Sequence, residues 1–119
     1  MLQNRNIIMD CDPGHDDAIA LILAGAQSSP LNILAVTTVA GNQSVDKNTT
    51  NALNVLDIMN RGDIPVSVGA DRPLIKKAAF AESIHGESGL DGPELPKVPN
   101  LKPTNQHGVN VIIEEVLNS

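Results

Sequence analysis

The sequence predicts an α/β fold built on an open, mostly parallel sheet. Short β-branched and apolar runs alternate with longer helical segments between residues 6 and 68, and the strand-like runs show little polar alternation. Strands that alternate with helices imply right-handed crossover connections, which make neighbouring strands parallel. Composition agrees, because 119 residues with 41% hydrophobic and 18% charged side chains can form one modest core.

The first strand is predicted at Asn6–Asp10, where a short apolar run ends at an aspartate. A Pro-Gly turn follows, and Asp16–Ala26 is predicted to be a helix whose leading aspartates favour the positive end of the helix dipole. Because Ala18–Ala24 is apolar on every side, we expect this helix to be largely buried.

The second strand is predicted at Asn32–Val39, and Gly41 breaks it. Ser44 is expected to cap the next helix, in which apolar residues recur at helical spacing until Gly62 ends it. Pro65–Val68 is predicted to be a third short strand.

The remaining segment begins with an irregular stretch, residues 70–104, which is rich in proline and glycine. Long irregular stretches inside a domain are often functional. Thr104–Leu117 is predicted to be a helix, and a stripe of apolar residues should form its one buried face. The stripe consists of Val109, Ile112, Ile113, Val116 and Leu117. Since three strands make a small sheet and another strand is expected after such a helix, we expect the chain to be truncated.

Charge and composition exclude several classes of partner. A formal charge of -6 disfavours binding to phosphate backbones, and Phe80 as the single aromatic residue leaves little for base stacking. The sequence has no signal-peptide core and no apolar run of the ~20 residues that a membrane helix needs. Cys11 cannot form an internal disulfide, which fits a reducing compartment. We therefore expect a cytoplasmic protein that binds neither nucleic acid nor membranes.

A cluster of carboxylates follows the first predicted strand: Asp10, Asp12, Asp16 and Asp17. All should lie at the carboxyl end of the sheet, where open α/β sheets bind their ligands. Four carboxylates within eight residues repel one another unless a cation or shared protons neutralise them. Ligation by oxygen alone favours calcium or magnesium over zinc.

Three other interpretations of this cluster were weighed. Helix capping with a solvated acidic turn is the ordinary role of a single Asp before a helix, but four carboxylates favour a metal or polyol site. A calcium-binding EF-hand loop is excluded because Gly14 occupies its fifth position. The Asp10-Cys11-Asp12 sequence also fits phosphatases with an aspartate nucleophile. A phosphatase of this kind is the second interpretation. It ranks below a metal site because its chemistry would not require Asp16 and Asp17.

Three segments together resemble one known family, the inosine-uridine-type nucleoside hydrolases. Asp10–Ala18 resembles the signature of that family, Thr37–Gln43 resembles its second-strand segment, and Ile84–Leu90 resembles its substrate-loop motif. The resemblance implies an open, Rossmann-like α/β fold in which residues 1–119 form the N-terminal part of a single hydrolase domain. It also implies hydrolysis of the N-glycosidic bond of ribonucleosides of the inosine, uridine and cytidine class, with bound calcium.

Roles carried over from the resemblance fall on six residues. Asp12 would be the general base and a calcium ligand, Asp17 a second calcium ligand, and Asp10 a support for the metal site. Asp16 and Asn42 would hold ribose hydroxyls, and His85 would line the pocket near the base. A water held by calcium beside Asp12 would lose its proton more easily, which pairs a nucleophile with a base.

Two hypotheses about the chain remain open after the resemblance. The chain is either part of an active hydrolase in nucleoside salvage, or a catalytically incomplete remnant that persists as an oligomer by burying its exposed sheet edge. A homo-oligomer, either a dimer or a tetramer, is expected. The segment Gly89–Pro93 resembles pyrimidine-preferring or broad members of the family more than strict purine ones.

Overall fold

The computed structural model describes residues 3–77, 87–90, 92 and 94–118 and confirms the predicted α/β fold. Strands β1 (Arg5–Cys11), β2 (Leu31–Thr38) and β3 (Val66–Val68) form a parallel sheet in the order β1-β2-β3. The described helices are α1 (His15–Gly25), α2 (Val45–Ile58) and α4 (Gly108–Leu117). Each element predicted from the sequence is present, with ends that differ by a few residues.

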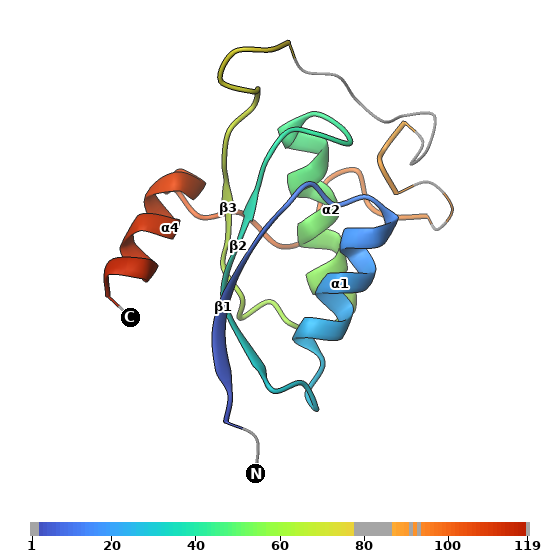
Figure 1. Ribbon diagram of the computed structural model, residues 1–119. Coiled ribbons are helices and arrows are strands. Elements are labelled where there is room, and N and C mark those ends of the chain that lie inside the picture. Colours follow the sequence, from blue (N-terminus) through green and yellow to red (C-terminus); the bar gives the residue numbers. More distant parts are fainter. Residues whose placement is uncertain (1–2, 78–86, 91, 93, 119) are drawn as a thin grey trace.

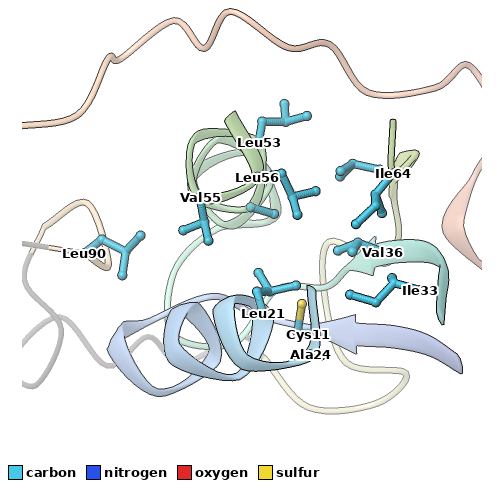
Figure 2. Packing of buried hydrophobic residues seen from close by; sticks show 12 residues of the cluster. Cys11, Leu21, Ala24, Ile33, Val36, Leu53, Val55, Leu56, Ile64 and Leu90 are labelled. Carbon is cyan, nitrogen blue, oxygen red and sulfur yellow. The ribbon is translucent and has the colours of Figure 1, made fainter. Parts of the chain in front are cut away.

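The sheet lies between two helical layers (Figure 1). Helices α1 and α2 cover one face, and α4 lies against β2 and β3 on the other. The core fills the space between the sheet and α2, where Val36 and Leu56 are fully buried and face the buried Leu21 of α1 (Figure 2). The central strand β2 is therefore covered on both sides, as its continuous apolar sequence predicts.

The two ends of α2 are determined by local sequence. The hydroxyl of Ser44 accepts a hydrogen bond from the backbone N–H of Lys47 at 3.3 Å, so the predicted cap is confirmed. The predicted end at Gly62 is wrong. Asn60, with φ of 58°, takes the left-handed position, and the N–H groups of Asn60 and Arg61 donate back to carbonyls of the last helical turn. Asparagine tolerates this conformation, so the helix ends without glycine.

Helix α1 is not largely buried, contrary to the prediction. Leu21 and Ala24 are buried, but the side chains of Ile19 and Leu23 are 59% and 68% exposed. Among the described helices and strands, α1 packs chiefly on β2 and on α2, so a helix that is apolar all round has one covered face.

Helix α4 uses a different face from the predicted one. Gly108 and Val111 are buried, and a Cβ on Gly108 would lie 3.1 Å from the Cα of Gly69 and 3.2 Å from the Cβ of Thr37. This close approach determines which side of the helix faces the sheet. Four members of the predicted stripe are exposed: Val109, Ile113, Val116 and Leu117. None of the helices in the described ranges has the length and apolar character that a membrane span requires.

Candidate active site

The candidate site lies where β1 and β2 end. Asp10 pairs with Thr37 and Cys11 with Thr38 in the parallel register, so the turn after β1 and the turn after β2 leave the sheet at the same edge. The first turn leads into α1 and carries Asp12, and the second leads into α2 and carries Asn42. Residues that lie 30 positions apart in the chain therefore meet.

The position of the helices also makes the carboxyl end of β1 a candidate ligand site. The first two helices cover one face of the sheet and α4 covers the other (Figure 1). In doubly wound sheets such a change of face occurs where the strand order reverses, and ligands bind at the carboxyl ends of the strands beside that point. The described strands follow the order β1-β2-β3 without a reversal, and β1, which ends at Cys11, forms one edge of the sheet.

Asp12 is held by the second turn through two hydrogen bonds. Its Oδ2 accepts a hydrogen bond from the backbone N–H of Asn42 at 2.9 Å, and the side-chain amide of Asn42 donates to the Asp12 carbonyl at 2.8 Å. A Cβ on Gly41 would lie 2.2 Å from Asp12 Oδ2, so only glycine fits there. The structure thus brings together two predicted site residues, Asp12 and Asn42, and orients the carboxylate.

Asp17 folds back onto the same turn from the first turn of α1. Its Oδ2 accepts a hydrogen bond from the backbone N–H of Asp12 at 3.1 Å. The pKa of Asp17 is raised above its usual range, first by burial, then by the Asp12 side chain and by the charge of Asp16, although the backbone bond from Asp12 opposes these effects. The two predicted calcium ligands are therefore neighbours whose negative charges repel each other.

Asp10 is anchored to the neighbouring strand. Its Oδ1 accepts a hydrogen bond from the hydroxyl of Thr37 at 2.6 Å, and Thr37 itself is completely buried. From the sequence, Thr37 is predicted only to be part of the second strand. The contact between Thr37 and Asp10 follows from the strand register, which places the two residues opposite each other.

Asn48 is a second residue with a role that the sequence alone does not predict. From α2 its side-chain amide donates to the carbonyls of Val39 and Gln43, at 2.8 Å and 3.0 Å, and so holds both ends of the turn that carries Asn42. Asn48 is fully buried. Asparagine is unfavourable inside helices. An asparagine within a predicted helix is therefore the sequence feature that indicates such a contact.

Cys11 lies in the hydrophobic core (Figure 2) and is 7% exposed. Burial, followed by the negative charges of Asp17, Asp10 and Asp12, raises the pKa of its thiol to about 12. A thiol that stays protonated at neutral pH is not a nucleophile. Cys11 therefore packs in the core and takes no part in the chemistry of the site. His85 lies outside the described residues.

The described residues include candidate ligands for a metal ion. Across the described ranges, no group of three or more His, Cys, Asp and Glu side chains is arranged to hold a metal ion. The carboxylates of Asp12 and Asp17 nevertheless fit a hard divalent cation in their chemistry, because calcium binds six to eight oxygen ligands. Two carboxylates fill only part of such a shell.

A cavity of about 780 Å³ lies elsewhere, between α2 and the described residues 87–90, 92 and 94–97. Its lining includes Lys47, Asn54, Leu90 and Pro96 but none of the four aspartates. The carboxylates lie instead beside the edge of β1, which no other described strand covers. An open position at the sheet edge, rather than this cavity, is therefore the candidate active site.

Comparison with known proteins assigns this arrangement to a family. A family model described as inosine-uridine preferring nucleoside hydrolase matches residues 7–119. The chain belongs to this family. A pyrimidine-specific ribonucleoside hydrolase RihA from Shewanella sp. (strain MR-4) is 53% identical over 116 residues, which cover 98% of this chain and 36% of the relative. RihA from Photobacterium profundum is 54% identical over 109 residues, covering 92% and 34%.

Solved structures agree with the family assignment. The plant nucleoside hydrolase PpNRh1 superposes with a TM-score of 0.83 at 34% identity, covering 96% of this chain and 36% of that one. A purine-preferring ribonucleoside hydrolase from Gardnerella vaginalis gives a TM-score of 0.81 at 26% identity, covering 95% and 36%. This chain therefore spans about a third of the length of these nucleoside hydrolases, and the predicted family and fold are both confirmed.

Proposed function

We propose that this chain carries the general base and about half of the calcium and ribose site of a nucleoside hydrolase. The complete protein would hydrolyse the N-glycosidic bond of ribonucleosides to free base and ribose, with residues 1–119 as the N-terminal part of its single domain. The observation that carries this proposal is the fixed carboxylate of Asp12, which Asn42 orients and Gly41 leaves room for.

Asp12 is proposed as the base because one of its oxygens is fixed and the other can accept a proton. The hydrogen bond from Asn42 to Oδ2 sets the plane of the carboxylate, so a water beside Oδ1 would find a proton acceptor already in place. Calcium held by Asp12 and Asp17 would lower the pKa of a bound water and bind ribose hydroxyls. The charges of these residues would also stabilise an oxocarbenium-like transition state.

Asn42 and Asp16 are proposed to hold ribose hydroxyls. Asn42 uses one side-chain N–H for the Asp12 carbonyl, and an amide has a second N–H and a carbonyl oxygen to offer to a substrate. Asp16 is exposed at the start of α1, next to Asp17. His85 is proposed to line the pocket near the base. Asp10, which Thr37 anchors, would support the metal ligands from β1.

A pyrimidine nucleoside is the proposed substrate. The relatives that are 53% and 54% identical are named pyrimidine-specific, whereas the solved structure named purine-preferring is only 26% identical. Uridine and cytidine are therefore expected to react faster than inosine.

The topology indicates where the other site residues would come from. Right-handed crossovers on opposite faces of a sheet progress in opposite directions across it. Because α1 and α2 lead from β1 towards β3 on one face, a strand that follows α4 on the other face would pair with the free edge of β1. Its carboxyl end would then lie beside Asp10 and Asp12, and could complete the ligand shell.

The test is a substrate and metal panel on the longest protein that the natural reading frame encodes. Release of base from uridine, cytidine and inosine would be measured with calcium, with magnesium and after chelation. We expect calcium-dependent hydrolysis with the pyrimidine nucleosides fastest. Magnesium-dependent release of phosphate from phosphate esters would support the phosphatase alternative, and an oligomer without activity on any substrate would support the remnant.

A further inference from the structure

Helix α2 carries three buried asparagines on one face: Asn48, Asn51 and Asn54, which are 0%, 4% and 2% exposed. Residues three apart lie side by side on a helix, so they form a polar row along α2. Each donates its side-chain amide to a backbone carbonyl of a loop outside the helix. Asparagine lowers the stability of a helix interior, so the stabilising contribution of this row lies in its hydrogen bonds to the loops.

Asn51 differs from its neighbours because it joins two segments of the candidate site. Its side-chain nitrogen donates to the carbonyl of Pro13 at 3.1 Å and to the carbonyl of Ser88 at 2.8 Å. Pro13 directly follows Asp12, and Ser88 lies in the stretch that resembles the substrate-loop motif. Both hydrogens of the amide are therefore used, one for each segment.

The segment Glu87–Leu90 is shaped to meet Asn51. Gly89 has φ of +88°, and a Cβ there would lie 3.0 Å from the side-chain nitrogen of Asn51, so glycine permits the approach. On either side, Lys47 Nζ donates to the carbonyl of Glu87 at 2.8 Å, and Leu90 is buried in the core (Figure 2). The segment is thus held by one central contact and one anchor at each end.

We propose that Asn51 is a positioning residue that fixes the Asp12 turn and the Glu87–Leu90 segment at one spacing. The two segments would then move together, so that base and metal ligand stay in register with the loop expected to contact the substrate. This inference rests on the proposed function for what the two segments do, but the mechanical tie itself does not depend on activity.

The first experiment compares Asn51→Leu with the matched control Asn54→Leu. Both remove a buried amide of similar size from the same face of α2, but Asn54 donates to Pro96, away from the Asp12 turn. The measurement is hydrogen exchange by mass spectrometry on the 119-residue chain. In Asn51→Leu, the exchange rate should rise about tenfold in residues 12–17 and in residues 87–90. A loss of about 1.4 kcal/mol of local stability raises the opening constant tenfold. The control should change neither segment.

Gly89→Ala provides a second route if Asn51→Leu does not fold. Its Cβ and its positive φ would push the segment away from Asn51 while the amide stays in place. Faster exchange in residues 12–17, far along the chain from the substitution, is expected. No change in that segment for either variant, or equal changes in Asn54→Leu, would overturn the inference.

Calcium affinity is the readout that a purely structural role would not affect. Measured by calorimetry with calcium chloride, Asn51→Leu should weaken binding about tenfold, corresponding to about 1.4 kcal/mol, while Asn54→Leu should leave it unchanged. Equal affinity in Asn51→Leu and the parent chain would contradict the proposal. If the parent chain binds no calcium, the proposed metal site fails in this chain, and the exchange comparison alone decides the positioning role.

Discussion

The turns after β1 and β2 differ sharply from the outer faces of α1 and α4. In the turns, Asp12, Asp17 and Asn42 are joined by backbone and side-chain hydrogen bonds of 2.8 to 3.1 Å. On the outer faces, apolar side chains such as Leu23 and Leu117 are 68% and 77% exposed. The carboxylate geometry is therefore fixed by contacts among the described residues, whereas these residues leave the outer faces of α1 and α4 exposed.

Gly41→Ala is expected to have the largest effect on activity, because it disturbs the hydrogen-bonded turns. Its Cβ would lie 2.2 Å from Asp12 Oδ2, so the carboxylate must leave its position or the turn must open. We predict a loss of about 100-fold or more in nucleoside hydrolysis by the complete protein, the range typical of a displaced general base.

Gly62→Ala is the control for that substitution. Its Cβ would meet only the end of the Leu101 side chain, at 3.1 Å, which can shift. Activity within about twofold of the parent is expected, since surface changes of this kind are nearly neutral. Equal activity of Gly41→Ala and Gly62→Ala would show that Asp12 does not need its present position.

Leu56→Ala tests whether the core beneath the turns is a true native core. Leu56 is completely buried between α2 and the sheet, so we expect the free energy of unfolding to fall by about 2–5 kcal/mol. Denaturant unfolding of the chain measures this. A loss below about 1 kcal/mol would contradict the packing described for α2.

The raised pKa of Cys11 predicts how the free energy of unfolding changes with pH in the alkaline range. Its pKa is raised from 9.0 to about 12 in the folded state, so the stabilisation is complete below pH 9 and is lost as pH rises from 9 to 12. Between these values unfolding should become easier by about 1.4 kcal/mol per pH unit, and Cys11→Ala should remove this slope. A slope that persists unchanged in the alanine variant would assign the effect to other groups.

The sequence predicted the order of strands and helices because apolar periodicity and turn residues are local signals. It predicted Asp12 and Asn42 as site residues through the family resemblance, but not the bond between them. That bond depends on the parallel register of β1 and β2, which no local pattern specifies. The same register explains why the contact between Thr37 and Asp10 was not expected.

Faces of helices were predicted less well than their positions. The apolar stripe of α4 was assigned to the core, yet Gly108 and Val111 make the contact with the sheet. A hydrophobic stripe shows that a face needs cover, but not which surface covers it. The same reason applies to α1, whose apolar surface is only partly used by the described residues.

Leu23→Gln should have the smallest effect on stability. It tests the exposed outer face of α1. In the 119-residue chain the substitution should change the free energy of unfolding by less than about 0.5 kcal/mol, because Leu23 is 68% exposed. In the complete protein, where this face is expected to be covered, the loss should reach about 1.5–3 kcal/mol. Equal effects in both would show that α1 gains no further cover.

The most direct test of the account is the rate of uridine hydrolysis with calcium for Asp12→Asn in the complete protein, beside Asp46→Asn as control. Asp46 is an exposed aspartate in the first turn of α2, so the control removes the same charge outside the candidate site. We expect the rate to fall about 100-fold or more for Asp12→Asn and to stay unchanged for Asp46→Asn. An unchanged rate in Asp12→Asn would contradict the assignment of Asp12 as the base.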